Sequence, residues 1–334
     1  MKIAVVGCGA VGSYYGAMLG RDGHDTHFLL RSDYEAVRCN GVLVRSVNGD
    51  FKVRPKSARR PKEIGVADLV LIALKTTAND QFAKLVPPLV GPNTIVLTLQ
   101  NGLGNEEQLA ELFSPEQVMG GLCFVCLNRI APGVIHHIAH GTIVTGEFQR
   151  PPQPRTHEIA GMFKHAGVPC RATDNLERAH WEKLIWNIPF NGLGVAGSAG
   201  YEAVVSGIVP ANLQIGSCLP TNKLLGDPHW EKLVRELMLE VIAAANKLGL
   251  QVSESQADKQ IERTRDMGAY FASTLIDFDR RQPLELEGMF LEPLRQAQKG
   301  GVAAPRLKAL CEVLKQLDAR RSRQSKVTPG HGRD

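Results

Sequence analysis

The chain has 334 residues, of which 43% are hydrophobic and 22% charged, with a formal net charge of +5. This is an ordinary globular composition, and the length allows two domains with separate cores. We expect no membrane span, because no apolar run approaches the roughly 20 residues that cross a bilayer. We expect no nucleic-acid partner, because the basic residues accompany no known binding motif. A strand in place of a signal segment predicts a cytoplasmic protein.

The first twenty residues carry the most informative motif. Residues 2–6 are a short apolar run typical of a buried strand, and a helical pattern begins near residue 11. Between them stands the G-x-G-x-x-G motif Gly7-Cys8-Gly9-Ala10-Val11-Gly12. In a dinucleotide-binding fold Gly7 permits the tight turn, Gly9 lets a pyrophosphate approach the backbone, and Gly12 lets helix and strand pack closely. The helix N-terminus then faces the phosphates.

The end of the second predicted strand, residues 25–30, indicates which dinucleotide binds. An NAD-binding unit carries an acidic residue there for the ribose 2′-hydroxyl. Here the strand ends in Leu30-Arg31, and Asp33 and Glu35 come only after the strand end. A guanidinium binds a 2′-phosphate, whereas a carboxylate repels it. We therefore predict NADP rather than NAD; otherwise Arg31 is an ordinary surface charge.

The following elements fit a doubly wound sheet. Residues 41–56 alternate as in a hairpin with its turn at 48–50, and residues 68–74 and 94–99 read as buried parallel strands. Lys75 and Asn101 follow these two strands, at the edge where ligands of such sheets bind. The sequence then predicts a helix at 106–113, strands at 119–128, 133–139 and 142–148, a helix at 156–166 and a strand at 169–172.

Cysteines and histidines give no sign of a disulfide framework or a metal site. The chain has seven scattered cysteines. Cys123 and Cys126 stand three apart on a predicted strand, so their thiols should point to opposite faces. A histidine cluster (His136, His137 and His140) lacks further ligands at metal spacing. We expect no bound metal.

The second half of the chain reads as helical. Helices are expected near 229–248, 254–279, 284–299 and 303–320. We therefore predict a Rossmann-type α/β domain at 1–174, an all-helical domain at 175–320, and a basic, flexible tail at 321–334. The apolar helices could pack within the chain or across a homodimer.

Lys183, Asn187 and Asn191 stand four apart and share one helix face beside aromatic neighbours. Pro189 should kink this helix, and the following Gly192 and Gly194 should loosen it. Such a polar row suits a carbonyl reductase, in which a lysine ammonium protonates the developing alkoxide. From this segment alone a solvated surface row is an equally good interpretation.

Taken together, these motifs resemble the ketopantoate reductase (2-dehydropantoate 2-reductase) family over nearly the whole chain. The matching pieces are the glycine motif, Leu30-Arg31, Leu74-Lys75, Gln100-Asn101-Gly102-Leu103-Gly104, Trp181-Glu182-Lys183-Leu184 with Asn187 and Asn191, and Ser273 with Glu285. The flank of Glu285, Leu284-Glu285-Leu286-Glu287-Gly288, is more apolar and bulkier than the pattern usual in the family.

The resemblance implies an NADPH-binding Rossmann domain and a helical domain like that of 6-phosphogluconate dehydrogenase, with a 2-oxo acid substrate between them. It implies that Lys183 is the proton donor and that Glu285 closes the site near the nicotinamide ribose. Further roles are implied for residues that hold the substrate (Asn101, Asn187, Asn191 and Ser273) and for residues that line the cofactor (the 7–12 turn, Arg31, Lys75, Asn101, Cys126 and Glu285).

Two alternatives remain open on the sequence. One is a reductase of another branched or aromatic 2-oxo acid. The other is a catalytically silent NADP-binding sensor or interaction protein, which would need the first domain but neither Lys183 nor Glu285.

Overall fold

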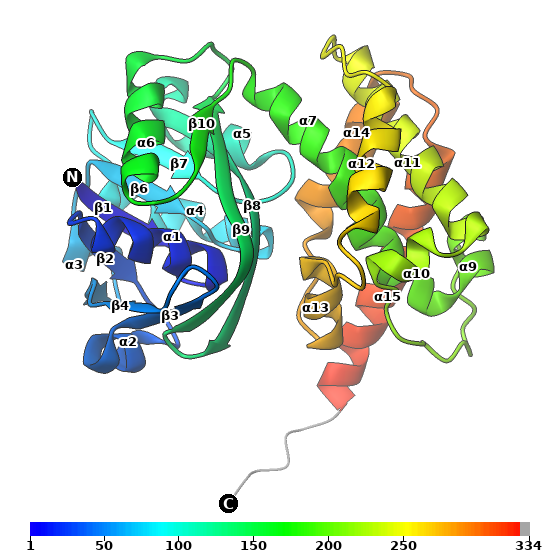
Figure 1. Cartoon of the computed structure of the whole chain (residues 1–334), viewed down its shortest axis with the longest axis horizontal. Helices are drawn as coiled ribbons and strands as arrows, with labels where there is room; N and C mark the ends of the chain where they lie inside the picture. Colours follow the sequence, from blue (N-terminus) through cyan, green and yellow to red (C-terminus); the bar gives the residue numbers. More distant parts are fainter. Residues whose placement is uncertain (328–334) are drawn as a thin grey trace, which may run out of the picture. The chain divides into compact units, whose positions relative to one another are not determined.

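The computed structural model describes residues 1–327, with side chains up to residue 321. The chain forms two compact units, Met1–Ala179 and the part from His180 onward (Figure 1). The division falls inside helix α7 (Leu176–Asn187), a few residues beyond the domain boundary that we expected at 174. Among the described residues no helix combines the length and the apolar character of a membrane span.

A ten-stranded mixed sheet forms the centre of the first unit. Its order is β4-β3-β9-β8-β7-β6-β1-β2-β5, with β10 paired to β9. The strands are β1 (Lys2–Val6), β2 (Asp25–Leu29), β3 (Val42–Ser46), β4 (Phe51–Val53), β5 (Lys56–Ala58), β6 (Leu69–Ile72), β7 (Ile95–Thr98), β8 (Val118–Ala131), β9 (Val134–Glu147) and β10 (Cys170–Ala172). The predicted hairpin at 41–56 is confirmed as β3 and β4, an antiparallel pair. The central strands β1, β2, β6 and β7 are parallel, as predicted.

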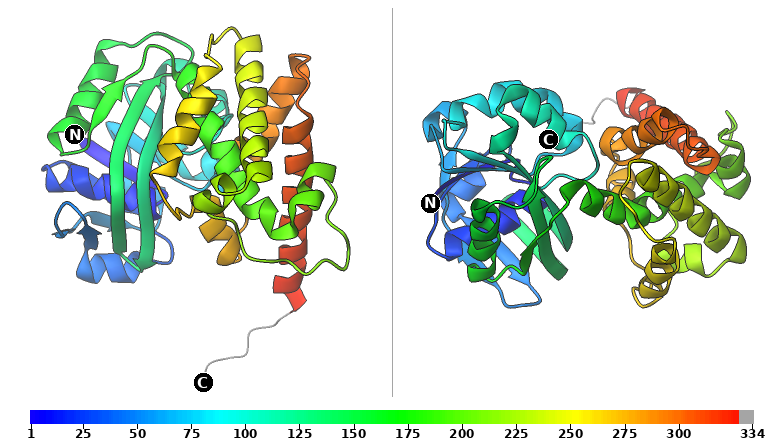
Figure 2. Two further views of the ribbon diagram at one scale, coloured as in Figure 1. Left: turned by 45° about the vertical axis from the view of Figure 1, so that its right-hand side comes forward. Right: turned by 90° about the horizontal axis from the view of Figure 1, so that it is seen from above.

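Helices cover both faces of this sheet (Figure 2). Ile3 and Val5 of β1 pack in one core with α1 (Ala10–Arg21) and α6 (Pro154–His165). Ala4 and Val6, which point the other way, pack in a second core. That core includes residues of α3 (Pro61–Ile64), α4 (Phe82–Leu85) and α5 (Asn105–Leu112). α2 (Tyr34–Asn40) follows β2, and short η1 (Thr76–Gln81), η2 (Pro87–Leu89) and η3 (Pro115–Gln117) connect the remaining elements.

Strands β8 and β9 form a long antiparallel ribbon, which corrects one prediction. We expected two strands at 133–139 and 142–148, but β9 is a single strand. His140 and Gly141 adopt positive φ angles of 64° and 129°, and the pairing with β8 shifts register near Phe124. An irregularity of this kind bends a strand without ending it, so the interrupted polar pattern belongs to one element.

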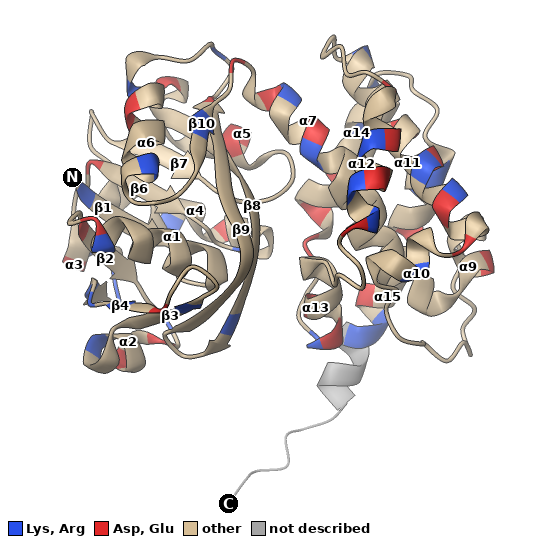
Figure 3. Ribbon diagram, viewed as in Figure 1, with Lys and Arg blue, Asp and Glu red and all other residues tan. Residues whose placement is uncertain are grey.

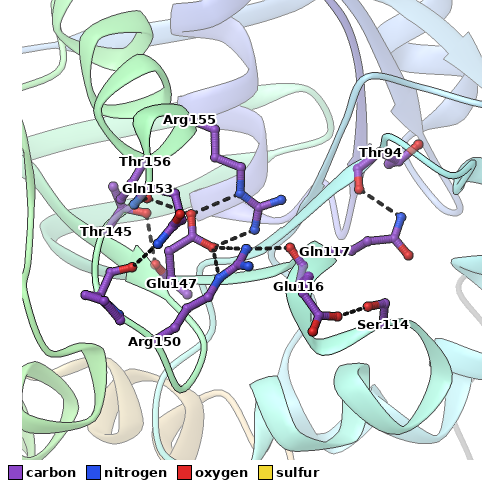
Figure 4. A network of polar contacts seen from close by, with 12 residues as sticks. Thr94, Ser114, Glu116, Gln117, Thr145, Glu147, Arg150, Gln153, Arg155 and Thr156 are labelled. Atoms are coloured by element: carbon purple, nitrogen blue, oxygen red, sulfur yellow. Dashed lines mark hydrogen bonds and ion pairs between the residues drawn. The ribbon is translucent and has the colours of Figure 1, made fainter.

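A buried carboxylate anchors the end of the ribbon at which β9 finishes. Glu147 is 1% exposed at the end of β9. Its oxygens accept hydrogen bonds from Arg150 Nη2 at 2.8 Å, Arg155 Nε at 3.0 Å and Thr156 Oγ1 at 2.6 Å (Figure 4). These contacts join the sheet to the start of α6, where Thr156 also completes a capping box with Gln153.

The second unit is helical. After α7 come η4 (Ile188–Leu193), α8 (Gly194–Ala196), η5 (Gly197–Ala199), α9 (Tyr201–Ser206), α10 (Thr221–Leu225), α11 (Pro228–Lys247), α12 (Ser255–Arg265), α13 (Ser273–Asp279), η6 (Glu287–Leu291), α14 (Glu292–Lys299) and α15 (Pro305–Val327). Charged residues stand along α11 and α12, whereas α1 of the first unit is almost free of them (Figure 3). The predicted helix at 229–248 is confirmed as α11.

Two predicted helices are each divided in the structure. The helix expected at 254–279 is two helices, α12 and α13, because the chain turns at Gly268, whose φ is 61°. Thr221 holds that turn: its Oγ1 donates to Gly268 O at 2.7 Å, and Tyr270 N donates to it at 3.0 Å. The helix expected at 284–299 begins as a π-helical segment, η6, and continues as α14.

The last helix is longer than the sequence suggested. We expected a flexible tail from residue 321, but α15 continues to Val327. Arg320 Nη2 donates to the backbone oxygens of Val209 at 2.7 Å and Pro210 at 2.8 Å, and the Arg321 guanidinium lies 3.3 Å from the Phe278 ring centroid. These contacts secure the helix at the point where the tail was expected to begin. The rest of the predicted tail, 328–334, lies outside the described residues.

Candidate active site

The glycine motif forms the turn between β1 and α1. Gly7 has a φ of 97°, and a side chain there would collide with the backbone of Leu74 and Ala73. A side chain at Gly12 would collide with the Gly7 oxygen. Gly7 and Gly12 therefore keep the turn tight and α1 close to the sheet, as the motif predicts. Cys8 turns its thiol inward, 3.5 Å from Val5 O, and burial raises the pKa of that thiol.

Gly9 differs from its two neighbours in the motif. It is exposed, and nothing lies within 4 Å of the place where a side chain would begin. Gly9 is also the N-cap of α1, makes no side-chain cap, and is followed by a first turn without acidic residues. The backbone N–H groups of Ala10 and Val11 are thus available to an anion. Open space at Gly9 beside such a helix end fits a bound pyrophosphate.

The sheet topology gathers the other predicted cofactor residues at one edge. Arg31 follows β2, Lys75 follows β6 and Asn101 follows β7, and these strands are parallel to β1 and to one another in register. Arg31 and Lys75 are exposed, and Asn101 is half-buried. All three therefore lie at the carboxyl edge of the sheet together with the Gly7–Gly12 turn, where ligands of doubly wound folds bind.

A chain of side-chain amides, which sequence reasoning missed, connects two of these loops. Gln100 Nε2 donates to Asn79 Oδ1 at 2.8 Å, and Asn79 Nδ2 donates to Asn105 Oδ1 at 2.9 Å. Asn105 Nδ2 in turn donates to the backbone oxygen of Asn101 at 3.1 Å. Gln100 and Asn105 are 4% and 1% exposed. The loop after β6 and the loop carrying Asn101 are thereby held in one arrangement.

Asp33, just beyond Arg31, is also engaged with distant partners. Burial raises the pKa of this carboxyl, but hydrogen bonds from Arg129, the Gly133 N–H and Ser32 outweigh burial and lower the pKa overall. Arg129 belongs to β8 and Gly133 to the turn that follows it. No periodicity or local motif could connect residues that stand 96 and 100 positions apart.

Cys126 lies on the part of β8 that extends beyond β7. The two strands pair from Val118 to Gly120, and Cys126 follows at a half-buried position. All seven cysteines are free thiols in the structure. Among the described residues there is no group of three or more His, Cys, Asp and Glu that could hold a metal ion. His137 is fully buried and bonds to Ser46 Oγ at 2.9 Å and to His140 O at 2.9 Å.

The predicted acid and two of its neighbours follow one helical run in the second unit. Lys183 is half-buried on α7, and Asn187, 7% exposed, is the last residue of that helix. Asn191, 2% exposed, lies in the π-helical segment η4. The kink expected at Pro189 takes the form of this wider turn, which accommodates a residue without an N–H. The row is mostly buried, which argues against a solvated surface stripe.

Ser273 and Glu285 lie on segments that pack around η4. The backbone N–H of Thr274 donates to Asn191 Oδ1 at 3.2 Å, which brings Asn191 to the start of α13, beside the exposed Ser273. Thr274 Oγ1 lies 3.9 Å from Met289 Sδ of η6. Half-buried Glu285 stands just before η6, which is also π-helical. Such segments are frequent at functional sites.

Comparison with known proteins gives these features a family. The family model described as "Ketopantoate reductase PanE/ApbA" matches residues 3–150, and "Ketopantoate reductase PanE/ApbA C terminal" matches residues 215–318. The chain belongs to the ketopantoate reductase family. This confirms the resemblance found in the sequence, and with it a Rossmann-type first unit and a helical second part.

Relatives in this family match the chain over nearly its whole length. A 2-dehydropantoate 2-reductase of Nostoc sp. is 39% identical, with 96% of each chain covered. The crystal structure of a 2-dehydropantoate 2-reductase from Geobacter metallireducens has a TM-score of 0.86 and 47% identity, covering 95% of this chain and 99% of that one. A D-mandelate dehydrogenase solved with NADH shares the fold at a TM-score of 0.84 with 18% identity. The protein is therefore an NAD(P)-dependent oxidoreductase that acts on CH–OH groups.

Proposed function

We propose that this protein reduces the ketone of 2-dehydropantoate to the alcohol of pantoate, with NADPH as the hydride donor. The observation that carries the proposal is the mostly buried run of Lys183, Asn187 and Asn191, which ends in the π-helical turn η4. A first unit with an open dinucleotide turn accompanies it, in a chain of the ketopantoate reductase family. A silent sensor would need only that first unit.

The preference for NADPH rests on the charges after β2. Arg31 is exposed there, and its planar guanidinium suits a 2′-phosphate. The two carboxylates nearby are occupied: Asp33 accepts from Arg129, and Glu35 from Arg38 and Arg59. Lys75, which follows β6 at the same edge of the sheet, adds a second positive charge there.

In the proposed reaction, bound NADPH would supply a hydride to the ketone carbon. Lys183 gives a proton from its ammonium to the ketone oxygen, so that the alkoxide becomes a hydroxyl. Before the proton moves, the same positive charge stabilises the negative charge that develops on that oxygen. Asn187, Asn191 and Ser273 hold the carboxylate and hydroxyl of the substrate. Asn101 contacts both cofactor and substrate, and Glu285 acts near the nicotinamide ribose.

The test is NADPH oxidation followed by absorbance with a panel of 2-oxo acids. We expect 2-dehydropantoate to be turned over with the highest kcat/KM. The segment around Glu285 is apolar, with Leu284 4% and Met289 2% exposed. Because such a segment suits an apolar substrate side chain, another branched or aromatic 2-oxo acid is the second candidate. A better substrate within the panel would favour that candidate, and tight NADPH binding without any turnover would favour the sensor.

Lys183→Ala tests the assignment of the acid. We expect kcat to fall by about 10²–10⁴, the range for a lost general acid, with the dissociation constant for NADPH nearly unchanged. Lys247→Ala, at the end of α11, is the control and should keep full activity. Unchanged turnover in Lys183→Ala would remove this lysine from the mechanism.

Arg31→Ala tests the choice of cofactor. The KM for NADPH should rise while the KM for NADH stays the same, because only NADPH carries the 2′-phosphate. An equal rise for both cofactors would contradict a 2′-phosphate contact.

A cytoplasmic location and a homodimer through the helical part remain predictions. The free thiols suit a reducing compartment.

A further inference from the structure

Asp33 stands where an acidic residue would reverse the cofactor preference. In dinucleotide folds a carboxylate after the second strand accepts hydrogen bonds from the adenosine ribose, and it repels a 2′-phosphate. The chain therefore carries two opposite signals within three residues, since Arg31 favours the phosphate and Asp33 opposes it. The contacts that Asp33 makes in the structure therefore decide whether its negative charge or the positive charge of Arg31 acts on the 2′-position of a bound cofactor.

The structure pairs both oxygens of the Asp33 carboxylate with donors of the protein itself. Asp33 is 5% exposed and occupies the N-cap position of α2, yet its side chain makes no cap. Arg129 Nε donates to its Oδ2 at 2.8 Å, and Arg129 Nη2 donates to its Oδ1. Gly133 N donates to Oδ2 at 3.0 Å, and Ser32 Oγ donates to Oδ1 at 2.9 Å. Each oxygen thus accepts two hydrogen bonds, which fills its lone pairs.

We propose that Arg129 is a specificity-determining residue: it occupies Asp33, withholds that carboxylate from the adenosine ribose, and leaves Arg31 as the charge that the 2′-position meets. The inference rests on the proposed use of NADPH by the first unit. Arg129 is a positioning residue in this role, since it acts through Asp33 and stands on the β8–β9 ribbon.

Glu35, the second acidic residue of the same segment, is also paired with arginines. Glu35 accepts from Arg38 Nη2 at 3.1 Å and from Arg59 Nη2 at 2.6 Å. Arg59 follows β5, and its guanidinium lies 4.2 Å from the ring centroid of Tyr34. Arg31 has no hydrogen bond or ion pair to any residue within the described chain. Nearby carboxylates are therefore neutralised while one guanidinium stays available.

The test measures binding of NADPH and NADH separately, by nicotinamide fluorescence, without any 2-oxo acid. Arg129→Leu leaves the Asp33 charge unneutralised near the 2′-position. We expect the dissociation constant for NADPH to rise at least roughly tenfold, as an unscreened like charge at this range implies. The constant for NADH should stay the same or fall, because the freed carboxylate can accept from the ribose hydroxyls. If the Asp33–Arg129 ion pair only stabilised the loop, Arg129→Leu would weaken the binding of NADPH and NADH to the same extent.

A double variant separates charge from shape. Asp33→Asn combined with Arg129→Leu removes both charges, and we expect it to regain most of the NADPH affinity that Arg129→Leu loses. Should Arg129→Leu fail to fold, Arg129→Gln keeps N–H donors for Asp33 without the charge, and the same shift in preference is expected. Arg235→Leu is the matched control, because it breaks an Arg–Asp pair of similar geometry in the second unit. It should change neither constant.

The outcomes keep this inference apart from the proposed function. An NADPH-to-NADH affinity ratio that stays at the wild-type value in Arg129→Leu or Arg129→Gln would overturn the role of Arg129 and leave the reductase untouched. A wild-type protein that binds neither cofactor would instead overturn the proposed function. A shift toward NADH in Arg129→Leu that the double variant reverses would support the inference.

Discussion

The three glycines of the turn after β1 are required for different physical reasons. Side chains at Gly7 and Gly12 would meet backbone atoms, of Leu74 and of Gly7 respectively. A side chain at Gly9 would meet no atom of the protein. The constraint on Gly7 and Gly12 is therefore internal packing, whereas the need for glycine at position 9 comes from a ligand that approaches the backbone.

This difference predicts opposite effects for two alanine substitutions. Gly12→Ala should destabilise the protein by about 1–3 kcal/mol, the usual cost of overpacking. Gly9→Ala should leave the free energy of unfolding nearly unchanged but weaken NADPH binding, because the added methyl group fills the space beside the helix N-terminus. Urea unfolding and a fluorescence titration measure the two quantities. Equal stability losses in both variants would contradict this division.

At the scale of single residues, the sequence predicted where a residue lies in the fold better than it predicted which side chains that residue contacts. The glycine motif, Arg31, Lys75 and Asn101 lie where their strands predicted, because each is defined by its own local pattern. The Asp33–Arg129 ion pair and the amide chain through Asn79 were missed, since such contacts are set by strand order in the sheet. A single sequence carries no local signal of which distant side chain will be adjacent.

Among the elements, the segment after α7 differs most from expectation. Gly192 and Gly194 were predicted to loosen the helix, but they allow close packing instead. A side chain at Gly192 would approach Leu310 to 2.7 Å and Phe290 to 2.9 Å. One at Gly194 would approach Leu275 to 2.6 Å and the oxygen of Leu219 to 3.0 Å. The prediction of looseness was wrong because glycine spacing alone cannot distinguish a flexible loop from a crowded helix contact.

Two matched glycine substitutions test this packing. Gly194→Ala should lower the free energy of unfolding by about 1–3 kcal/mol, because Leu275 and a backbone oxygen occupy the required space. Gly161→Ala, on an exposed turn of α6 with nothing within 4 Å, should raise it by about 0.5–1 kcal/mol. Thermal and urea unfolding measure both. Stabilisation by both variants would mean that the start of α8 is not tightly packed.

The other errors at this scale have the same origin. Strand β9 was divided in the sequence interpretation because its alternation changes phase at His140 and Gly141, where the structure has an irregular register. Helices α12 and α13 were joined because the turn at Gly268 depends on hydrogen bonds to Thr221. In both cases a partner from elsewhere in the fold decides where the element ends.

For the molecule as a whole, buried carboxylates make stability depend on pH. Burial raises the pKa of Glu147, but hydrogen bonds from Arg155, Thr156 and Arg150 outweigh burial and lower the pKa overall. A carboxyl whose pKa is lower in the folded state contributes stability above its unfolded pKa of about 4.3. That contribution is lost as the pH falls through the folded value.

Glu147→Gln should therefore flatten the acid side of the stability profile. The variant should be less stable than wild type at pH 7, because two arginines lose their charge partner, and the difference should shrink below about pH 4. Urea unfolding at several pH values measures it. Glu312→Gln, which breaks an exposed pair with Lys315, is the control and should change little. A constant difference at all pH values would contradict the assignment.

The contact between Asp33 and the β8–β9 ribbon also has a consequence for the order of folding. Strand β3 pairs with β9, and Asp33 bonds to residues about 100 positions later. During synthesis, the loop carrying Arg31 therefore leaves the ribosome long before the residues that fix it. Pairings of such long range slow folding. We expect a nascent chain to gain its preference among cofactors only when the ribbon has been made, so that nucleotide binding reports completion of the first unit.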